Sequence, residues 1–493
     1  MKSSAAVAVL ILVALLMPGL PLVRGATVAA PEYRTDQVLI QPKAGINRAA
    51  LAAFHVARGA SVRGEFKAAG GAQVITLPAG ETVAGLIAKY RQSGLVEFAE
   101  PDYFVYANST LPNDPYYTNG LLWGLNTIDA TDAWDVVTSA SNLVVAVLDS
   151  GIWTTHLDLA SNMWVNPLDG GHGYNAYTGT NNPTDDGGHG TLVAGVLGGV
   201  GNNGIGVCGV AWQVQMMACK CLTASGTGSD STVTACVNYA LANGAKIINA
   251  SFDSPTPSLA VSNAIVAAQA AGVIWIASAG NSPNSGPGRN IDLTPGYPSC
   301  YGLDNIVSVA YTDRTDALGH FSNYGATNVA LAAPGDQMYS TMLGANNATY
   351  YPPLNLGVTL AGTSFSAPYV AGACALLMAQ YPSDNYHQTI SRLLQGTDSI
   401  PALAGKCRTG GRLNLRKALR TILINPLPPT NGVPFQLLVA GGLNRTCTVQ
   451  ASPDLVNWSP VYTNTTTTND TFIYADSQSG TMSQRFYRAT AAP

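Results

Sequence analysis

Ser364 stands in the segment GTSFSAPYVAG, residues 362–372, where a Gly-Thr turn precedes an Ala- and Val-rich stretch typical of a helix. A serine hydroxyl is a weak nucleophile unless a neighbouring base takes its proton. Serine is also a good helix N-cap, so its position alone does not decide its role. A helix N-terminus offers free N–H groups and a positive dipole end, which would stabilise a developing oxyanion. The segment predicts a strand-to-helix turn that presents a hydroxyl over electropositive backbone.

His189 is the histidine best placed to act as that base. It lies in DDGGHGTLVAGV, between Gly188 and Gly190, at the start of an apolar helical stretch. Glycine on both sides lets other backbone approach the imidazole closely. The remaining five histidines lack this pattern. A structural or surface role is the alternative for any single histidine.

Asp149 could orient the histidine, because it ends the apolar run LVVAVLDSG at residues 143–151. In a parallel sheet, functional sites assemble at the carboxyl ends of the strands. A carboxylate after an apolar run costs desolvation free energy unless it has a partner. A surface-turn aspartate is the alternative, and the two downstream segments weaken it. Together, these three residues could supply a nucleophile, a base and a carboxylate that orients the base.

The segments VLDSGI, GGHGTLVAGV and GTSFSAPYVAG, in the order Asp, His, Ser, resemble the catalytic blocks of subtilisin-like serine proteases, the subtilases. An α/β-hydrolase would place its serine first, within G-x-S-x-G, and residue 366 is a serine where that motif requires glycine. The likeness runs from about Trp123 to about Leu415. It implies that Ser364 is the acylated nucleophile, His189 the general base and then acid, and Asp149 the group that fixes the imidazole tautomer.

The resemblance also assigns Asn281, in the segment SAGN, to the oxyanion hole beside the Ser364 backbone N–H. Taken alone, Asn281 would be interpreted as a turn residue. The chain departs from the family at Leu192, where histidine is common, and at Phe365-Ser366, where Met-Ala is common.

Substrate binding in this family adds a β-strand between two rims of the active-site groove. Asp253 departs from the family pattern, which usually has glycine there. Its carboxylate could favour a basic side chain before the scissile bond, narrow the groove, or point into solvent. By resemblance, the substrate-binding residues are Gly226, Thr227, Gly228, Ser251, Phe252, Asp253, Ser278, Ala279 and Gly280.

The segment NNGIGV at 202–207 resembles the family's calcium loop, and Asp158 in HLDL matches its partner carboxylate. Calcium prefers several oxygen ligands of mixed type. The implied set is Asp158, the Asn203 side chain, and the Ile205 and Val207 carbonyls. A plain glycine-rich turn is the alternative. Catalysis itself is expected to need no cofactor.

Alternation of apolar strands with helices predicts an α/β fold, in which a central parallel sheet is covered by helices on both faces. The expected strands are Leu143–Leu148, Val214–Ala218, Lys246–Asn249, Val273–Ala277 and Ile306–Val309. The expected helices include Thr191–Leu197, Ser231–Ala242 and Ser258–Ala271.

Smaller segments are expected on both sides of this domain. The N-terminal segment is expected to form a small α+β, ferredoxin-like module. It resembles the propeptide of the family, which acts as an inhibitor and a folding chaperone. The stretch Asn108–Asn119 reads as an exposed connection, with cleavage near Asn108–Leu111. The predicted order is a signal peptide at 1–26, a propeptide at 27–110, a catalytic domain at 111–425, a Pro-rich linker at 426–434 and a small β-rich domain at 435–493.

Composition limits the compartment and the partners. The net charge of the 493-residue chain is −4 and no long Lys/Arg run occurs, so nucleic acid is not expected as a partner. A basic start followed by an apolar core of about a dozen residues is the layout of a secretory signal peptide, so we expect secretion. The core is too short for a membrane span, which needs about 18 apolar residues. No later stretch is long enough for a stable membrane span. Eight cysteines in an exported chain predict disulfides, with Cys407 the nearest candidate partner for Cys447.

We therefore expect a secreted, self-processing, monomeric serine endopeptidase that acts on proteins and peptides and has its own propeptide as an inhibitor. One alternative is an inactive relative used for binding, which the complete set of catalytic residues does not support. The other is that the C-terminal unit has the main role and the protease unit serves only maturation.

Overall fold

The computed structural model describes residues 33–103, 110–282, 286–344, 349–351, 360–428, 430, 433–442, 446–466, 470–479 and 484–491. The predicted signal peptide lies outside these residues, as do residues 104–109 at the predicted cleavage region. The chain divides into two compact units, Met1–Asn108 and Ser109–Pro493. No helix in the described part is both long enough and apolar enough to cross a membrane.

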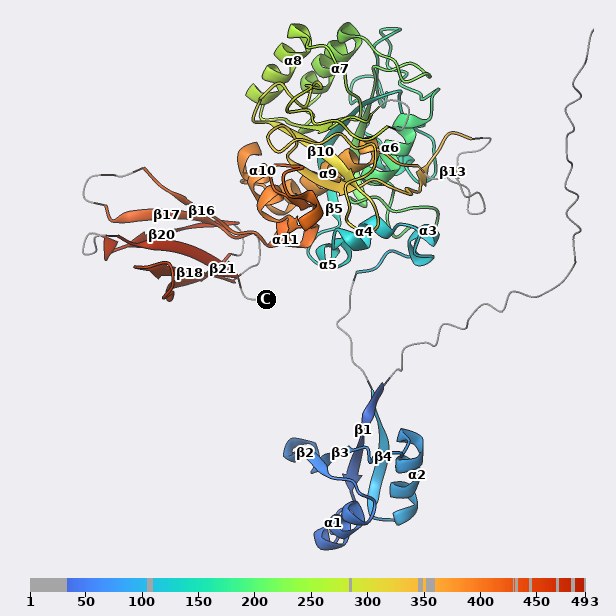
Figure 1. The fold of residues 1–493 in the computed structure, drawn as a ribbon, viewed down its shortest axis with the longest axis vertical. Helices are drawn as coiled ribbons and strands as arrows, with labels where there is room; N and C mark the ends of the chain where they lie inside the picture. Colours follow the sequence, from blue (N-terminus) through green and yellow to red (C-terminus); the bar gives the residue numbers. More distant parts are fainter. Residues whose placement is uncertain are drawn as a thin grey trace, which may run out of the picture. The chain divides into compact units, whose positions relative to one another are not determined.

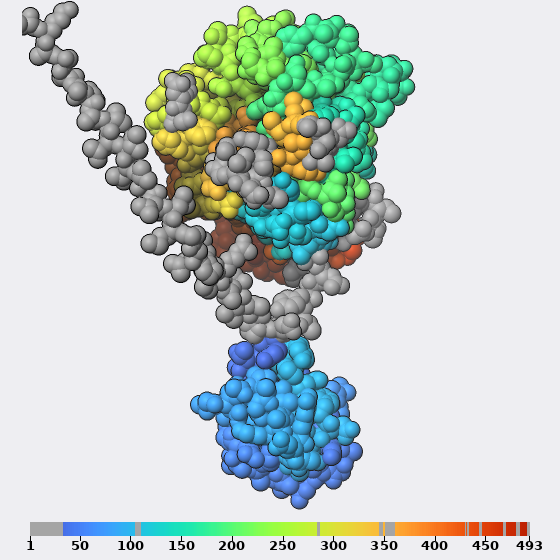
Figure 2. Space-filling model, turned by 90° about the vertical axis from the view of Figure 1, so that its right-hand side faces the viewer, coloured from blue at the N-terminus to red at the C-terminus, as the bar shows by residue number. Residues whose placement is uncertain are grey.

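The first unit is a four-stranded antiparallel sheet with two helices (Figure 1). The strand order β2-β3-β1-β4 confirms the predicted ferredoxin-like arrangement. Figure 2 shows this unit, in blue, as a rounded body. The residues of strand β2 are mostly exposed and show no apolar alternation, so the sequence gives no sign of this strand. The elements are β1 Tyr33–Pro42, α1 Arg48–Ala57, β2 Val62–Phe66, η1 Lys67–Ala69, β3 Ala72–Thr76, α2 Val83–Ser93 and β4 Val96–Tyr103.

Nine strands form the central sheet of the second unit, in the order β14-β15-β11-β10-β9-β8-β5-β7-β6. Neighbouring strands are parallel except at the β14 edge, which is antiparallel to β15. The predicted parallel sheet is thus confirmed, and β5 lies between β8 and β7. The strands are β5 Ser139–Asp149, β6 Gly173–Asn175, β7 Gln213–Lys220, β8 Ile247–Ala250, β9 Ile274–Ser278, β10 Ile306–Thr312, β11 Leu331–Pro334, β14 Asp398–Ser399 and β15 Gly411–Arg412.

Helices cover both faces of this sheet (Figure 1). Successive side chains of a strand point to opposite faces. On β5, Val145 and Val147 therefore join the core made with α6 and α9, whereas Ala146 and Leu148 join the core made with α7 and α8. The helices of the second unit are α3 Pro115–Thr118, α4 Trp123–Thr127, α5 Ala130–Trp134, η2 Ala160–Asn162, α6 His189–Gly198, α7 Asp230–Ala242, α8 Leu259–Ala270, α9 Thr363–Gln380, α10 Tyr386–Gln395, η4 Pro401–Leu403 and α11 Leu415–Arg420, and a small ribbon pairs β12 Ser340–Thr341 with β13 Tyr350–Tyr351.

The C-terminal part forms two three-stranded sheets, β16-β17-β20 and β19-β18-β21, around a small apolar core. Strand β16 pairs with β17, so the Pro-rich segment predicted as an interdomain linker instead connects two strands of one sheet. The sequence did not reveal this because proline and glycine punctuate hairpins as well as linkers. The strands are β16 Leu423–Pro426, β17 Phe435–Ala440, β18 Thr446–Ser452, β19 Ser459–Thr465, β20 Thr471–Asp476 and β21 Phe486–Ala491.

Two other expectations need correction. The stretch expected as an exposed connection is partly folded, because the carboxylate of Asp114 is fully buried and accepts the backbone N–H groups of Asn202 and Asn203. The expected bridge from Cys407 to Cys447 is not formed. Cys407 lies in a core of the catalytic domain and donates to the Gly411 carbonyl, whereas Cys447 lies on β18 in the C-terminal sheets.

Arg392 of α10 joins the C-terminal sheets to the catalytic domain. Its guanidinium is fully buried, donates to both carboxylate oxygens of Asp384 at 2.5 and 3.2 Å, and lies 3.5 Å from the centre of the Tyr381 ring. It also donates to the carbonyl of Ala440 on β17 at 3.1 Å and to that of Thr421 before β16. One buried cation therefore connects α10 with strand β17 and with the residue that caps α11 before β16.

We predict that Arg392→Met destabilises the protein by about 3–5 kcal/mol, because Asp384 is left buried without its partner. Lys417→Met is the matched control. That lysine also pairs with a carboxylate, Asp398, but its side chain is 59% exposed, so we expect a loss of about 0–1 kcal/mol. Guanidinium-induced unfolding measures both values, and an equal loss in the two variants would contradict the role of Arg392.

Candidate active site

Asp149 and His189 form the central pair of the site. Asp149 is the last residue of β5 and is fully buried, and His189 is the first residue of α6. The Nδ1 atom of His189 lies 2.8 Å from Oδ1 and 3.0 Å from Oδ2 of Asp149. An ionised carboxylate only accepts hydrogen bonds, so Nδ1 carries the proton and Nε2 is left as the acceptor. Asp149 therefore fixes the tautomer that a general base needs.

Burial and charge act in opposite directions on His189. Burial lowers the pKa of the imidazole, but the charge and hydrogen bond of Asp149 raise it, and the charge of Asp185 adds to this rise. The net effect is a pKa above the ordinary value of 6.5. A base of this kind is neutral, and so competent, only at pH values above its raised pKa.

Ser364 is the second residue of α9, as the strand-to-helix turn predicts. Its hydroxyl donates to the carbonyl of Ser251, at the end of β8, over 3.2 Å. The described hydrogen bonds do not include one between Ser364 and His189. The two residues nonetheless lie on helices that pack together, and the rings of His189 and the adjacent Phe365 are 6.0 Å apart. A hydrogen bond from Oγ to the imidazole would require the hydroxyl to leave the Ser251 carbonyl.

Asn281 lies beside the start of α9, where the oxyanion hole is expected. Its Oδ1 accepts the backbone N–H of Thr363 at 3.1 Å and the Thr363 hydroxyl at 3.2 Å. Because Oδ1 is held by the residue before Ser364, the amide group is anchored to the turn that carries the nucleophile. Its Nδ2 lies 3.5 Å from the position that a Cβ on Gly362 would occupy.

The two predicted rims of the substrate groove lie on one cavity of about 280 Å³. Gly226, Thr227 and Gly228 line it from one side, and Phe252 and Asp253 from the other. Ser251 is instead bonded to Ser364, as described above. Ser278 ends β9, and Ala279 and Gly280 follow it; none of the three lines this cavity. The Ser278 hydroxyl donates to the Phe252 carbonyl of the second rim at 3.4 Å.

The carboxylate of Asp253 faces Arg289 and Gly280, although the residue as a whole is exposed. Its side chain is 29% exposed, and Oδ2 lies 4.0 Å from Nη2 of Arg289. A Cβ on Gly280 would come within 2.7 Å of the same Oδ2, so the carboxylate lies directly against that glycine. The side chain of Asp253, next to Arg289, therefore occupies space that a glycine at position 253 would leave open.

The predicted calcium residues surround a buried carboxylate. Asp158 is fully buried, accepts Nδ2 of Asn203 and the backbone N–H of Val207 at 2.8 Å each, and has its pKa raised to about 7, by burial first and by the charge of Asp114 as well. Ile205 lies in the same loop and donates its N–H to Oδ1 of Asn203. Two buried carboxylates, Asp158 and Asp114, contact this loop, and carboxylate oxygens are ligands that Ca²⁺ prefers. Both accept N–H donors in this structure, and the sequence analysis did not include Asp114.

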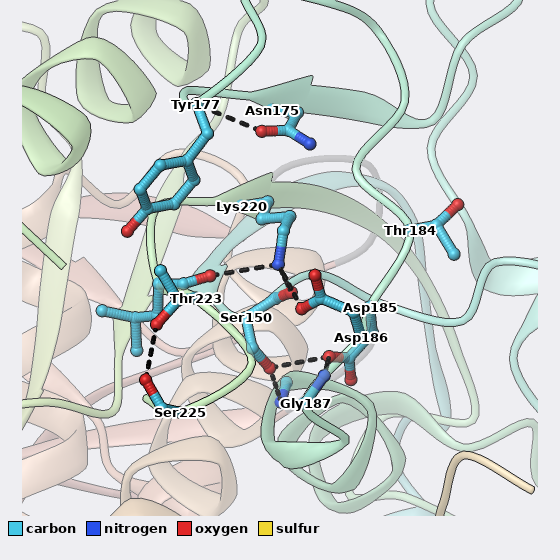
Figure 3. A network of polar contacts seen from close by, with 12 residues as sticks. Ser150, Asn175, Tyr177, Thr184, Asp185, Asp186, Gly187, Lys220, Thr223 and Ser225 are labelled. Carbon is cyan, nitrogen blue, oxygen red and sulfur yellow. Dashed lines mark hydrogen bonds and ion pairs between the residues drawn. The ribbon is translucent and has the colours of Figure 1, made fainter. Parts of the chain in front are cut away.

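Sequence reasoning also missed a polar network around Ser150 (Figure 3). Lys220 of β7 is buried and donates to the Ser150 carbonyl at 2.7 Å, to Asp186 at 2.6 Å and to the Leu222 carbonyl at 3.1 Å. The neighbouring Asp185 is also buried. The available signal was the Asp-Asp pair just before the GGHG segment.

Comparisons with known proteins agree with this geometry. A family model described as the subtilase family matches residues 140–416, and one described as the fervidolysin N-terminal prodomain matches residues 23–102. The chain is 34% identical over 298 residues to a thermophilic serine proteinase of Bacillus sp. strain AK1, covering 60% of this chain and 67% of that protein. It is 31% identical over 309 residues to thermitase of Thermoactinomyces vulgaris, covering 63% and 99%.

A solved structure, described as proteases from Pseudoalteromonas arctica PAMC 21717, superposes with a TM-score of 0.52 at 27% identity. The match covers 63% of this chain and 99% of that one.

Proposed function

Because the chain belongs to the subtilase family of serine proteases, we propose that it is a secreted endopeptidase that hydrolyses peptide bonds through an acyl-enzyme on Ser364. The observation that carries the proposal is the hydrogen bond of 2.8 Å from the His189 Nδ1–H to a fully buried Asp149. Ser364 lies at the start of the adjoining helix α9, and Asn281 accepts a hydrogen bond from the residue before Ser364. Secretion rests on the composition of residues 1–26.

In this mechanism, Oγ of Ser364 attacks the scissile carbonyl carbon while Nε2 of His189 takes its proton. The carbonyl oxygen becomes an oxyanion, which the Asn281 amide and the Ser364 backbone N–H stabilise. The imidazolium, stabilised by Asp149, then gives its proton to the leaving amine, and the C–N bond breaks. Water repeats the sequence on the acyl-enzyme, which releases the acid product and restores Ser364.

The first unit acts as an intramolecular inhibitor and folding chaperone in this proposal. The prodomain match over residues 23–102 supports it, and so does the separate apolar core of that unit. We place the propeptide at 27–110 and the catalytic domain after it, and we expect a monomer that acts on protein and peptide substrates. The proposed cleavage of its own chain would release the mature enzyme.

We expect the wild-type chain, but not Ser364→Ala, to hydrolyse casein and to lose its N-terminal unit by cleavage near Asn108–Leu111. N-terminal sequencing of the two purified proteins measures processing, and thermal unfolding checks that the variant is folded. Processing or casein hydrolysis by a folded Ser364→Ala protein would contradict the assignment of the nucleophile.

We propose that Asp253, held by Arg289, narrows the pocket for the residue before the scissile bond. Asp253→Gly should then raise kcat/KM for substrates with a large apolar residue there by about 10-fold or more, since space for a methylene or two changes specificity by that amount. Asp253→Asn is the matched control, because it keeps the volume and removes the charge, and it should leave the ranking of substrates unchanged. A loss of Lys/Arg cleavage in both variants would show a preference for basic side chains instead.

We also propose that Asp114, Asp158 and Asn203, with the Ile205 and Val207 carbonyls, hold a structural calcium ion. A ligand present at 100 times its Kd stabilises by about 2.7 kcal/mol, so chelation should lower Tm by roughly 5–10 °C and added Ca²⁺ should restore it. Asp158→Asn should make Tm insensitive to the chelator. An unchanged Tm of the wild type in chelator would contradict this site.

A further inference from the structure

Asp185 is a buried carboxylate that the proposed mechanism does not use. It lies in the loop before α6, is 4% exposed, and accepts five hydrogen bonds. Figure 3 shows its carboxylate facing Ser150 and Gly187. The donors are the Ser150 hydroxyl at 2.8 Å, the Gly187 and Gly188 N–H groups at 2.9 Å each, and the Thr191 N–H and hydroxyl at 3.0 and 2.6 Å.

These bonds hold the backbone on both sides of His189. Gly187 and Gly188 precede the histidine and Thr191 follows it, and all three donate to Asp185 directly. The N–H of Gly190 donates to the Ser150 hydroxyl at 3.0 Å, and that hydroxyl donates to Asp185. Ser150 in turn gives its backbone N–H to Oδ1 of Asp149 at 2.7 Å. The carboxylate of Asp185 thus connects the backbone before and after His189 to Ser150, which is the residue next to Asp149.

Close packing leaves this loop little freedom to move. A Cβ on Gly190 would lie 2.0 Å from the Gly151 carbonyl oxygen, and a Cβ on Gly151 would lie 2.3 Å from the Pro183 carbonyl oxygen. Gly151 also has a φ of +108°, which glycine adopts without strain. The loop before α6 therefore rests directly on the turn after Asp149.

Four charged groups lie in the region of the Asp185 loop, namely Asp149, Asp185, Asp186 and Lys220. Asp149 contacts the imidazole, and Asp185 lies behind the adjacent loop. Lys220 directs its ammonium group to Asp186 and to backbone carbonyls, and the described ion pairs do not include one with Asp185. The negative charge of Asp185 therefore acts on His189 together with that of Asp149, and both raise the pKa of the imidazole against the effect of burial.

We propose that Asp185 is a positioning residue for His189, which fixes the backbone on both sides of the base and holds the imidazole on Asp149 while the proton moves. The inference rests on the proposed function, because it requires His189 to be the base. Asp185 does not contact the reacting atoms in this account.

The test compares Asp185→Asn with Asp186→Asn in the full-length chain. The amide of the first variant keeps the size of the carboxylate, but it removes the charge and turns an NH₂ group toward donors. Asp186 is the matched control, because it is the next residue, its side chain is 59% exposed, and its charge is paired with Lys220. Fluorophosphonate titration counts active sites, so that kcat is expressed per competent enzyme.

Asp185→Asn should lower kcat by about 10- to 100-fold, since a small misplacement of a catalytic group costs this much, and should leave KM within about twofold. Loss of the negative charge destabilises the imidazolium, so the acid limb of the kcat/KM profile should move to lower pH. Asp186→Asn should keep kcat within about twofold of the wild type, because Lys220 keeps its hydrogen bonds to the Ser150 and Leu222 carbonyls and an amide oxygen still accepts a hydrogen bond. A purely structural role would lower the titrated fraction of enzyme without moving the acid limb.

Thr191→Val provides a second variant if Asp185→Asn fails to fold. It removes one donor to Asp185 and keeps every charge, so kcat should fall by about 3- to 10-fold with the acid limb unmoved. The inference is overturned if kcat and the acid limb of Asp185→Asn match the wild type, if both aspartate variants lose kcat equally, or if Thr191→Val retains full kcat. A wild type that neither titrates nor cleaves casein would instead refute the proposed function.

Discussion

The hydrogen bond between Asp149 and His189 is the interaction on which the catalytic account depends. A carboxylate at the end of an apolar strand is costly to bury, and here it is compensated by the imidazole and by the Ser150 N–H. The same bond fixes the proton on Nδ1, which leaves Nε2 to act as a base. One contact thus partners the buried carboxylate at the end of β5 and sets the protonation state of the histidine.

The surrounding fold serves to keep that contact in place. Because β5 lies between β7 and β8 in a sheet covered on both faces, the position of Asp149 is held by hydrogen bonds on either side. Helices α6 and α9 pack together on one face of the sheet. His189 and Ser364 lie at the starts of these two neighbouring helices. Because Gly190 has no side chain, the start of α6 can contact the backbone of the turn after Asp149 at Gly151.

The sequence predicted those features that depend on local pattern. Apolar runs identified β5, β7, β8, β9 and β10, and three spaced segments identified Asp149, His189 and Ser364. Contacts between distant segments were not visible in this way. The hydroxyl of Ser364 on the Ser251 carbonyl, the carboxylate of Asp114 on the 202–203 turn and the guanidinium of Arg392 on Ala440 each join residues more than 45 positions apart. The cysteines were misjudged for the same reason, since composition shows their number but not the cores in which they lie.

The most direct measurement of the central claim is the rate at which a fluorophosphonate labels Ser364 as a function of pH, in the wild type and in Asp149→Asn. The account predicts that the wild-type rate rises with pH through a single ionisation above 6.5, and that the variant is slower by about 10⁴-fold at neutral pH, because its imidazole is no longer held in the right tautomer. A wild-type rate independent of pH, or a folded Asp149→Asn protein that labels as fast as the wild type, would contradict it.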